Sequence, residues 1–381
     1  MEARGQFIKA SEIGTQGAKT LPGSFYTSPE RFREEQERIF LQHWICVGRE
    51  QRIPDPGDYF VCTMGTESVV VVRGRDGIVR ALYNVCRHRG TRICEEAEGH
   101  FKNAIRCPYH AWTYALDGRL IAAPSMDEAA GFAPADYPLH ASSLVIWEGF
   151  LFLSFATNPE PFETTHAPLL TKFRTYNLPT LHAARRIDYD VRANWKLIFE
   201  NYSECFHCAP VHPALVKLSP ADSGANDLVS GPFLGGYMLV KPDCGSMTLS
   251  GNACSLPVGD LSPEDHHRVY YYAIFPNMLL SLHPDYVMVH TLWPEAPDRT
   301  RIVCEWLFHP DAAAQPDFHP DDGVLFWDQT NREDWHVCEL SQLGVSSRAY
   351  TPGPYSPRES LSAAFDREYL RTLGFTEADV W

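Results

Sequence analysis

Two short cysteine–histidine pairs are the residues of this sequence best suited to bind a metal. The first pair is Cys86-Arg87-His88 and the second is Cys107-Pro108-Tyr109-His110. Each pair follows a strand-like stretch, so both are expected on loops. Two thiolates and two imidazoles can hold a structural zinc ion. They can also hold a [2Fe–2S] cluster, with both cysteines on one iron and both histidines on the other.

Basic residues around these pairs favour the cluster over zinc. They would place positive charge beside the cluster and its reduced form, and they are Arg87, Arg89, Arg92 and Arg106. Cys94 lies in the same region but fits neither pair. We therefore interpret Cys94 as a cysteine that binds no metal.

A second group of candidate ligands lies in residues 194–213. Nothing between Trp195 and Cys208 breaks a helix, and Pro210 is expected to end it. On that helix Glu200, Glu204 and His207 would share one face. His212 follows beyond the break, five residues after His207.

Two imidazoles at this spacing can converge on one metal ion. They would occupy two coordination positions of the metal and leave others for a third ligand and a substrate, as in an iron site with two histidines and one carboxylate. The alternative is that His207 and His212 only cap a helix end and bond to the backbone. The spacing alone does not choose between these interpretations.

Composition limits the classes of protein to which the chain can belong. Its 381 residues favour two domains, and the formal net charge of −15 argues against a nucleic-acid partner. No apolar stretch is long enough to span a membrane, and residues 1–20 show no apolar signal core, so a cytoplasmic location is expected. The eleven cysteines are expected to be metal ligands and buried thiols and not a disulfide framework. The cysteines interpreted as core residues are Cys46, Cys62, Cys244, Cys254 and Cys304.

The elements that must position these groups change in type along the chain. Ser28 and Pro29 are expected to begin a helix, and short strands follow from Trp44. A polar, proline-containing stretch over 156–161 suggests a domain boundary. The later strands have the spacing of an antiparallel meander, followed by a helix over Val324–Leu343. The predicted divisions are an N-terminal helical segment over 1–44 that packs on the last domain, a domain over 45–157 that contains the cysteine–histidine pairs and a domain over 158–381 that contains His207 and His212.

Both groups of residues together resemble one family, the Rieske non-haem iron oxygenases, large (alpha) subunit. Cys86-x-His88 and Cys107-x-x-His110 with the following Ala-Trp are similar to the Rieske signature. Asn194-Trp195-Lys196 with Glu200-Asn201, Glu204, His207 and His212 is similar to the family's catalytic motif. The resemblance implies an α+β fold in which an all-β Rieske [2Fe–2S] domain precedes a catalytic domain. That catalytic domain would have a curved antiparallel sheet and helices, of the helix-grip or START-like type.

The resemblance also implies a mononuclear Fe(II) held by His207, His212 and one late carboxylate. The candidates are Asp328, Glu333, Asp334 and Glu339. The family's terminal ligand motif places Asp334 at the iron, and helical spacing agrees. Trp327, Asn331, Asp334 and Cys338 share one face, whereas Glu333 points about 100° away.

Glu204 has the position of an acidic bridge between a cluster histidine and an iron histidine of adjacent subunits, which is the catalytic role that the resemblance assigns to it. The family usually has Asp there. The resemblance connects Glu with members that act on quaternary amines such as carnitine or betaines. The longer side chain can still accept imidazole N–H bonds and fix the rings.

The implied enzyme is a terminal oxygenase that works as a homotrimer. Electrons from NAD(P)H would arrive through a separate reductase of the flavin or ferredoxin type, rest on the cluster and cross to the iron, where O2 meets a small organic substrate. Monooxygenation of a quaternary amine N-methyl group would release formaldehyde, and aromatic ring faces could hold the cation. The aromatics that could do so are Tyr202, Phe206, Tyr270, Tyr271, Tyr272, Phe275 and Trp293. Core packing is the alternative for each of them.

Three other functions compete with this one. Ring hydroxylation of an aromatic compound would need an apolar pocket and, usually, a small β subunit. An electron-transfer ferredoxin would end near residue 157 and would not need His207, His212 and Asp334. A zinc-stabilised binding module would show no cluster absorbance.

Overall fold

The computed structural model describes residues 6–316 and 318–381, and their contacts divide the chain into two units. Unit 1 combines Met1–Ile39 with Thr171–Trp381, and unit 2 is Phe40–Leu170. The sequence-based limits at 44/45 and 157/158 differ from these divisions and stay a prediction of the domain limits. No helix among the described residues is long and apolar enough to cross a membrane.

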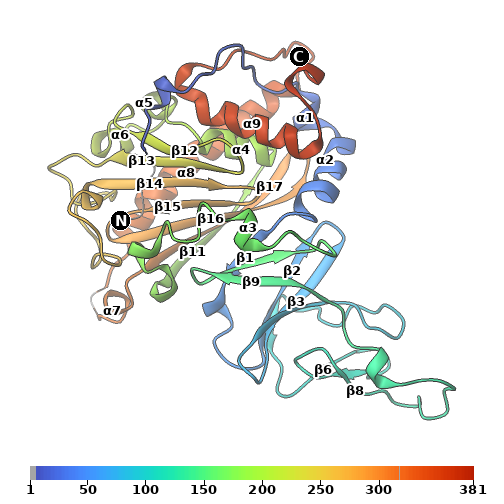
Figure 1. The fold of residues 1–381 in the computed structure, drawn as a ribbon. Helices are drawn as coiled ribbons and strands as arrows, with labels where there is room; N and C mark the ends of the chain where they lie inside the picture. The colour runs from blue at the N-terminus through green and yellow to red at the C-terminus, as the bar shows by residue number, and fades with distance from the viewer. Residues whose placement is uncertain (1–5, 317) are drawn as a thin grey trace. The chain divides into compact units, whose positions relative to one another are not determined.

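Unit 1 is built on a seven-stranded antiparallel sheet, in the order β11-β17-β16-β15-β14-β13-β12 (Figure 1). The meander expected from the sequence is confirmed, because β14 to β17 pair in succession. The strands are β11 (His182–Val191), β12 (Ala225–Val229), β13 (Phe233–Leu239), β14 (Arg268–Ile274), β15 (Met278–Leu282), β16 (Tyr286–Ala296) and β17 (Arg299–Phe308).

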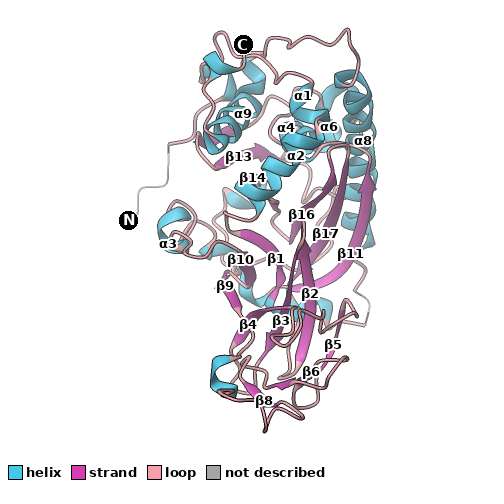
Figure 2. Cartoon of the chain, turned by 90° about the vertical axis from the view of Figure 1, so that its right-hand side faces the viewer, coloured by secondary structure: helices cyan, strands magenta, loops and turns pink. Residues whose placement is uncertain are grey.

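Three helices of unit 1 lie against this sheet and carry or support the candidate iron ligands (Figure 2). They are α4 (Trp195–Tyr202), α8 (Asp321–Val345) and α9 (Ser360–Leu373). Asn194 caps α4 by accepting the Lys196 N–H. The shorter helices are α1 (Ser24–Thr27), α2 (Pro29–Glu35), α5 (Cys208–Val211), α6 (Leu215–Leu218) and α7 (Pro310–Ala313).

Unit 2 is a β-structure with a seven-stranded sheet, β1-β10-β9-β4-β3-β2-β5, and a three-stranded sheet, β6-β7-β8. A buried apolar cluster includes residues of both sheets and of the loops that carry the two cysteine–histidine pairs. The elements are β1 (Ile45–Arg49), β2 (Asp58–Met64), β3 (Glu67–Arg73), β4 (Val79–Tyr83), β5 (Glu98–His100), β6 (Ile105–Arg106), β7 (Thr113–Tyr114), β8 (Leu120–Ala122), β9 (Ala141–Trp147), β10 (Phe150–Ser154) and α3 (Phe162–Thr165).

A buried polar network fixes α4 against α2 and α9. The Lys196 ammonium lies 2.6 Å from Glu35, which also accepts hydrogen bonds from Trp195 Nε1 (2.9 Å) and Tyr369 Oη (2.6 Å). Lys196 and Glu35 are fully buried, so each needs the other to offset its lost hydration. Residues 204–207 follow shortly after α4 and include the candidate ligand His207. By fixing α4, the network therefore also holds the loop that carries His207.

Two carboxyl groups of the same region have raised pKa values. Asp366 accepts a hydrogen bond from Tyr355 Oη at 2.7 Å, and Glu200 accepts one from Tyr26 Oη at 2.7 Å. Burial raises the pKa of Asp366 to about 7, although hydrogen bonds to Tyr355 and Glu200 oppose the shift. Burial, followed by the charge of Asp366, also raises the pKa of Glu200.

Asp366→Asn is expected to reduce the loss of stability that occurs as the pH rises. An Asp in the unfolded chain loses its proton near pH 3.8, whereas folded Asp366 keeps it to about pH 7. The folded state therefore binds more protons in this window, and stability falls as pH rises through it. We expect Asp366→Asn to remove about 1–3 kcal/mol of that pH dependence. The effect is measured from the thermal midpoints of wild type and variant at pH 5 and pH 8. The prediction would be contradicted if the midpoint fell by the same amount between these pH values in both proteins.

Candidate active site

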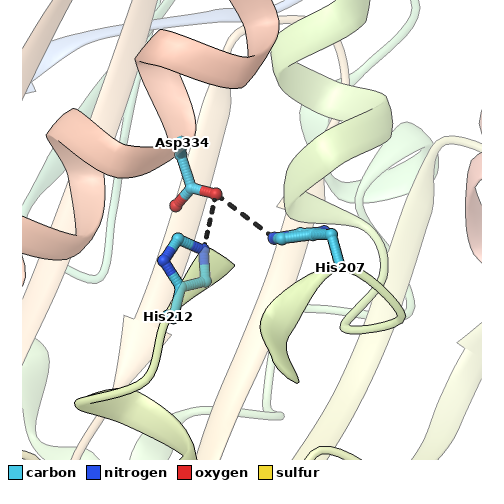
Figure 3. A group of neighbouring side chains, drawn as sticks. All are labelled: His207, His212 and Asp334. Atoms are coloured by element: carbon cyan, nitrogen blue, oxygen red, sulfur yellow. Dashed lines mark hydrogen bonds and ion pairs between the residues drawn. The ribbon is translucent and has the colours of Figure 1, made fainter. Parts of the chain in front are cut away.

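His207, His212 and Asp334 are brought together by the two ends of α5 and by α8. His207 precedes α5, His212 follows it, and Asp334 projects from α8 (Figure 3). Asp334 Oδ1 lies 2.9 Å from His212 Nε2 and 3.2 Å from His207 Nε2. Their ligand atoms all lie within 4.8 Å of one another, and among the described residues no other three His, Cys, Asp or Glu side chains form such a group. Two imidazoles and one carboxylate suit a mononuclear iron with open positions.

The helix that leads to this site is shorter than the sequence predicted. The expected helix over Trp195–Cys208 is wrong, because α4 ends at Tyr202. Ser203 Oγ donates to the Phe199 carbonyl at 2.6 Å, and the Glu204 carboxylate accepts the backbone N–H groups of the following residues. Such side-chain bonds to the nearby backbone replace helical hydrogen bonds.

The shorter helix changes two further expectations. Glu200 does not share a face with Glu204 and His207, since its carboxylate accepts a hydrogen bond from Tyr26 Oη. Pro210 does not end a helix but lies inside α5, which begins at Cys208. A proline in the first turn of a helix breaks no hydrogen bond, because the N–H groups there have no partner within the helix.

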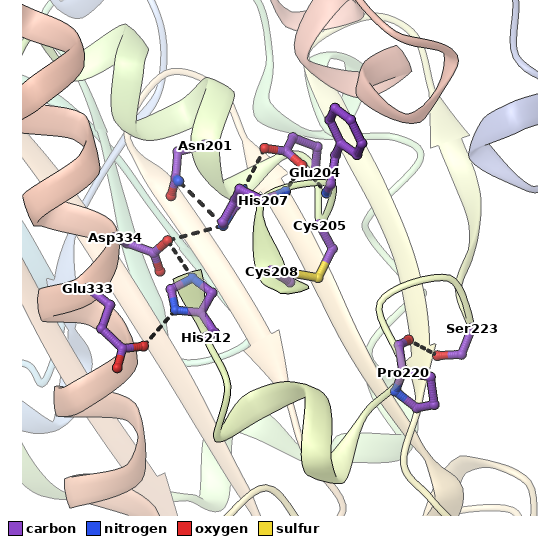
Figure 4. The surroundings of a disulfide bond; sticks show 11 residues. Asn201, Glu204, Cys205, His207, Cys208, His212, Pro220, Ser223, Glu333 and Asp334 are labelled. Atoms are coloured by element: carbon purple, nitrogen blue, oxygen red, sulfur yellow. Dashed lines mark hydrogen bonds and ion pairs between the residues drawn. A yellow bond between two sulfur atoms is a disulfide. The ribbon is translucent and has the colours of Figure 1, made fainter. Parts of the chain in front are cut away.

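Each imidazole is held at its second nitrogen by a glutamate (Figure 4). Glu204 Oε1 lies 2.5 Å from His207 Nδ1, and Glu333 Oε2 lies 2.8 Å from His212 Nδ1. Both Nε2 atoms therefore face Asp334. A carboxylate on the far nitrogen fixes the ring and its tautomer and makes the ring a stronger ligand. From the sequence, Glu333 was a candidate ligand beside Asp334, and this supporting contact was not predicted.

The charges of the group favour a cation between the three side chains. Burial lowers the pKa of His207, but hydrogen bonds to Asp334 and Glu204 outweigh it and raise the value to about 10. The pKa of His212 is also raised, because bonds to Asp334 and Glu333 outweigh burial. The two histidines in turn lower the pKa of Asp334, against the effect of its burial. A metal ion would replace the proton that this group otherwise binds.

Cys205 and Cys208 form a disulfide beside His207 (Figure 4). Their Cα atoms are 4.9 Å apart. The bond joins the loop between α4 and α5 to Cys208, the first residue of α5. No disulfide framework was expected from the sequence, and the pairing of Cys205 with Cys208 was not predicted. Of the five cysteines expected in the core, Cys46, Cys62 and Cys304 are buried, whereas Cys244 and Cys254 are partly exposed.

A cavity of about 260 Å³ opens onto the three candidate ligands, and six Phe, Tyr or Trp side chains are among the residues that line it. Three of the seven aromatics expected at the substrate line it, namely Tyr202, Phe206 and Tyr271. Tyr237, Trp327 and Trp335 also line it and were missed.

The other four expected aromatics do not line the cavity, namely Tyr270, Tyr272, Phe275 and Trp293. Tyr270 and Tyr272 flank Tyr271 on β14 and so point to the opposite face of the sheet. Phe275 follows the strand, and its ring lies 6.1 Å from that of Trp195. Core packing is the interpretation that the structure supports for these four.

The four candidate cluster ligands of unit 2 converge at the ends of two loops. Cys86 and Cys107 are buried, and the rings of His88 and His110 lie 4.8 Å apart. Burial raises the pKa of the Cys107 thiol, so a thiolate there needs a nearby cation. His88 Nδ1 is buried and has no hydrogen-bond partner among the described residues, which leaves it free to bind a metal.

These four side chains fit a cluster better than a single zinc ion. Ligands of one zinc lie about 2.0–2.3 Å from it and therefore close to one another. Among the described residues, His207, His212 and Asp334 form such a group of three, and no three of Cys86, His88, Cys107 and His110 do. Cys94 donates its backbone N–H to Asn84, and burial raises the pKa of its thiol to about 11. A structural role for Cys94 is consistent with both observations.

Family models match both units of the chain. Residues 43–138 match the Rieske [2Fe-2S] domain, and residues 178–374 match the ring hydroxylating alpha subunit (catalytic domain). Each match contains the candidate ligands that the structure brings together in that unit.

Curated relatives and solved structures agree with these matches. The glycine betaine monooxygenase oxygenase subunit of Chromohalobacter salexigens is 32% identical over 376 residues, which cover 90% of this chain and 82% of the relative. The carnitine monooxygenase oxygenase subunit of Escherichia coli is 39% identical over 201 residues, covering 52% of this chain and 53% of the relative.

Among solved structures, the quaternary ammonium Rieske monooxygenase CntA in complex with L-carnitine has a TM-score of 0.78 at 25% identity. The match covers 95% of this chain and 96% of that one. Naphthalene 1,2-dioxygenase from Rhodococcus sp. shares the fold, with a TM-score of 0.76 at 21% identity over 92% of this chain and 94% of that one.

The expected α+β architecture is confirmed, with a Rieske domain followed by a catalytic domain that has an antiparallel sheet and helices. A Rieske [2Fe–2S] cluster and a mononuclear iron are the cofactors of these two domains. The chain belongs to the family of Rieske non-haem iron oxygenases, as a ring-hydroxylating-type alpha subunit with both of its domains.

Proposed function

We propose that this oxygenase removes an N-methyl group from a quaternary amine by monooxygenation. The observation that carries the proposal is the aromatic cavity that opens onto His207, His212 and Asp334. One oxygen atom of O2 would enter a C–H bond of the methyl group, and two electrons and two protons would convert the other to water. The resulting N-hydroxymethyl product would break into a tertiary amine and formaldehyde, with release of a proton.

The cavity wall suits a cation that cannot form hydrogen bonds. A quaternary nitrogen has no N–H donor, so carboxylate acceptors offer it no directed bond, whereas ring faces attract its charge. Tyr202, Tyr271 and Trp327 provide such rings from α4, β14 and α8. His290 also lines the cavity, and burial lowers its pKa to about 4, so this side chain is neutral. A neutral imidazole does not repel a cationic substrate.

The metal-binding roles belong to the same proposal. Cys86, His88, Cys107 and His110 would bind the cluster, and His207, His212 and Asp334 would bind the iron. The iron supplies O2 activation when bound. Glu204 holds His207 Nδ1 and would bridge to a cluster histidine of a neighbouring subunit. That role requires an oligomer, and a homotrimer is our proposal. Electrons would come from NAD(P)H through a separate reductase, and a cytoplasmic location stays a prediction.

The names of the relatives support the choice of substrate class. The relatives described above are oxygenase subunits for glycine betaine and carnitine, which are quaternary amines. The naphthalene dioxygenase is below 25% identity and supports the fold alone.

Formaldehyde release from a panel of compounds tests the proposed reaction. Purified protein with a reductase, NADH and O2 is given methylated amines in one set and naphthalene-type aromatics in the other. We expect formaldehyde and a demethylated amine from at least one quaternary amine, and no ring-hydroxylated product. Hydroxylated aromatics without formaldehyde would contradict the proposal and favour the ring-hydroxylating alternative. A matched reaction without NADH measures any formaldehyde that does not arise from turnover.

The purified protein is expected to be brown and to show the rhombic EPR signal of a reduced Rieske centre. Cys107→Ser should abolish the colour and the signal, because a hydroxyl replaces a cluster thiolate. Cys94→Ser is the matched control, since Cys94 is buried in the same apolar cluster and is not expected to be a ligand. A colourless wild-type protein with stoichiometric zinc would contradict the assignment.

A further inference from the structure

The rim of the active-site cavity carries two basic side chains that the proposed chemistry does not use. Lys9 and Arg358 are the lysine and arginine among the described residues that line the cavity, and both are exposed. They lie in segments far apart in the sequence. Neither belongs to the group around His207, His212 and Asp334 or to the aromatic wall.

Lys9 is held at the rim by the residues that precede it. Ile8 exchanges two backbone hydrogen bonds of 2.7 Å with Asn226, so this segment is joined to β12 by an isolated antiparallel bridge. The Phe7 ring packs edge-on against Tyr237 at 4.9 Å. The Lys9 carbonyl then accepts the Glu12 N–H at the start of the 3-10 helix η1 (Ala10–Glu12). The backbone of Lys9 is therefore fixed on both sides.

Arg358 is held on a second short element. It lies in the 3-10 helix η8 (Pro357–Glu359), which begins at a capping box formed by Ser356 and Glu359. The helices η1 and η8 contact each other, and both contact α9 (Figure 1). The two cationic side chains therefore share one side of the rim.

Their charges are not neutralised within the described residues. Neither side chain has an ion pair there, in a chain with 33 basic and 48 acidic residues. The cavity also has three acidic residues in its wall. Glu204 and Asp334 already bind the imidazoles, and Asp222 is exposed and has no ion pair among the described residues. Two free cations at the entrance of a cavity in an acidic protein favour an anionic group there.

We propose that Lys9 and Arg358 bind a carboxylate of the substrate at the cavity rim. This inference rests on the proposed function and narrows its substrate to zwitterions that carry a quaternary nitrogen and a carboxylate. The aromatic wall would hold the nitrogen and present a methyl group to the iron side, while the carboxylate stays at the rim. An arginine can bind a carboxylate through two parallel N–H bonds, and a lysine adds a point charge.

The same arrangement discriminates against cations without a carboxylate. Choline or a betaine methyl ester carries a positive charge and has no carboxylate that could pair with Lys9 and Arg358. Such compounds would bind through the aromatic wall alone. The rim therefore determines specificity and plays no part in the chemical step.

Direct binding to the holoenzyme tests the proposal. Isothermal titration without reductant gives the Kd of glycine betaine, carnitine and γ-butyrobetaine, each beside its methyl ester, for the wild type and the variants. Lys9→Gln and Arg358→Gln should each raise the Kd of the zwitterions about tenfold, with a larger loss in the double variant. The Kd of the esters should not rise in these variants, because an ester offers Lys9 and Arg358 no carboxylate to bind. Arg358→Lys should restore part of the affinity because it keeps the charge.

Three further variants distinguish binding of the carboxylate by Lys9 and Arg358 from an effect of the protein's net charge. Lys217→Gln and Arg348→Gln remove exposed cations outside the cavity and should leave every Kd unchanged. Asp222→Asn removes the acidic group of the rim and should tighten binding of the zwitterions. A double variant that binds zwitterions as the wild type does would overturn the proposal, as would an equal loss of ester binding. Absence of formaldehyde from every methylated amine in the wild type would instead reject the proposed function.

Discussion

Asp334→Ala is expected to abolish turnover and to remove the mononuclear iron while the cluster stays intact. Asp334 Oδ1 is the group that both His207 Nε2 and His212 Nε2 face, at 3.2 and 2.9 Å. Without it, two neutral imidazoles would have to hold a divalent cation with no charge from the protein at that position. Iron analysis before and after dialysis, with the optical and EPR spectra of the cluster, measures both effects.

Two neighbouring carboxylates are the controls for Asp334. Glu333→Gln keeps a side chain that can accept from His212 Nδ1, so we expect at most a tenfold weaker retention of iron. Asp328→Asn should retain iron and activity, because Asp328 accepts from Tyr189 Oη and pairs with Arg332 away from the histidines. Loss of iron in Glu333→Ala but not in Asp334→Ala would show that the ligand is Glu333.

Glu204→Gln is expected to keep both metals and to slow electron transfer from cluster to iron by at least tenfold. The Glu204 carboxylate holds His207 Nδ1 at 2.5 Å and also accepts the His207 backbone N–H at 3.2 Å. An amide is a neutral acceptor, and charge-assisted hydrogen bonds are roughly twice as strong as neutral ones. The His207 ring and any bridge to a neighbouring cluster histidine would therefore be held less firmly.

Stopped-flow absorbance separates the two electron-transfer steps in Glu204→Gln. Reduction of the cluster by the external donor should match the wild type, whereas its reoxidation with substrate and O2 should be slow. Asp328→Asn is a suitable control, since it removes a carboxylate charge that pairs with Arg332 away from His207. Wild-type reoxidation in Glu204→Gln would show that electrons reach the iron by another route.

The candidate ligands could be predicted from the sequence because their types and spacing are local. Cys86 and His88, and likewise Cys107 and His110, are close in the chain, so each loop brings its own pair together. Asp334 was harder, and the α-helical period of 3.6 residues supported it because α8 is regular from Asp321 to Val345. The helical period failed for Glu204, since its carboxylate bonds to the backbone that the helix would have used.

The features that the sequence did not predict depend on contacts between distant elements. Glu333 reaches His212 across 121 residues, and Trp335 enters the cavity wall from α8. Tyr271 was selected together with Tyr270 and Tyr272, although a strand places alternate residues on opposite faces. If the two-residue period of a strand had been applied to Arg268–Ile274, Tyr271 would have been placed on one face and Tyr270 and Tyr272 on the other. The rim pair of Lys9 and Arg358 had no local signal at all.

A single turnover with isotopically labelled substrate tests the central claim most directly. Chemically reduced protein, free of reductase, is mixed with O2 and glycine betaine whose three N-methyl groups are fully deuterated, and the formaldehyde is trapped as a hydrazone. Our account predicts formaldehyde that retains two deuterium atoms, together with dimethylglycine in equal amount, and neither product from Asp334→Ala. If glycine betaine is not a substrate, deuterated carnitine and γ-butyrobetaine are tested in the same way. Reoxidation of the cluster with no deuterated formaldehyde from any of the three would contradict N-demethylation by this site.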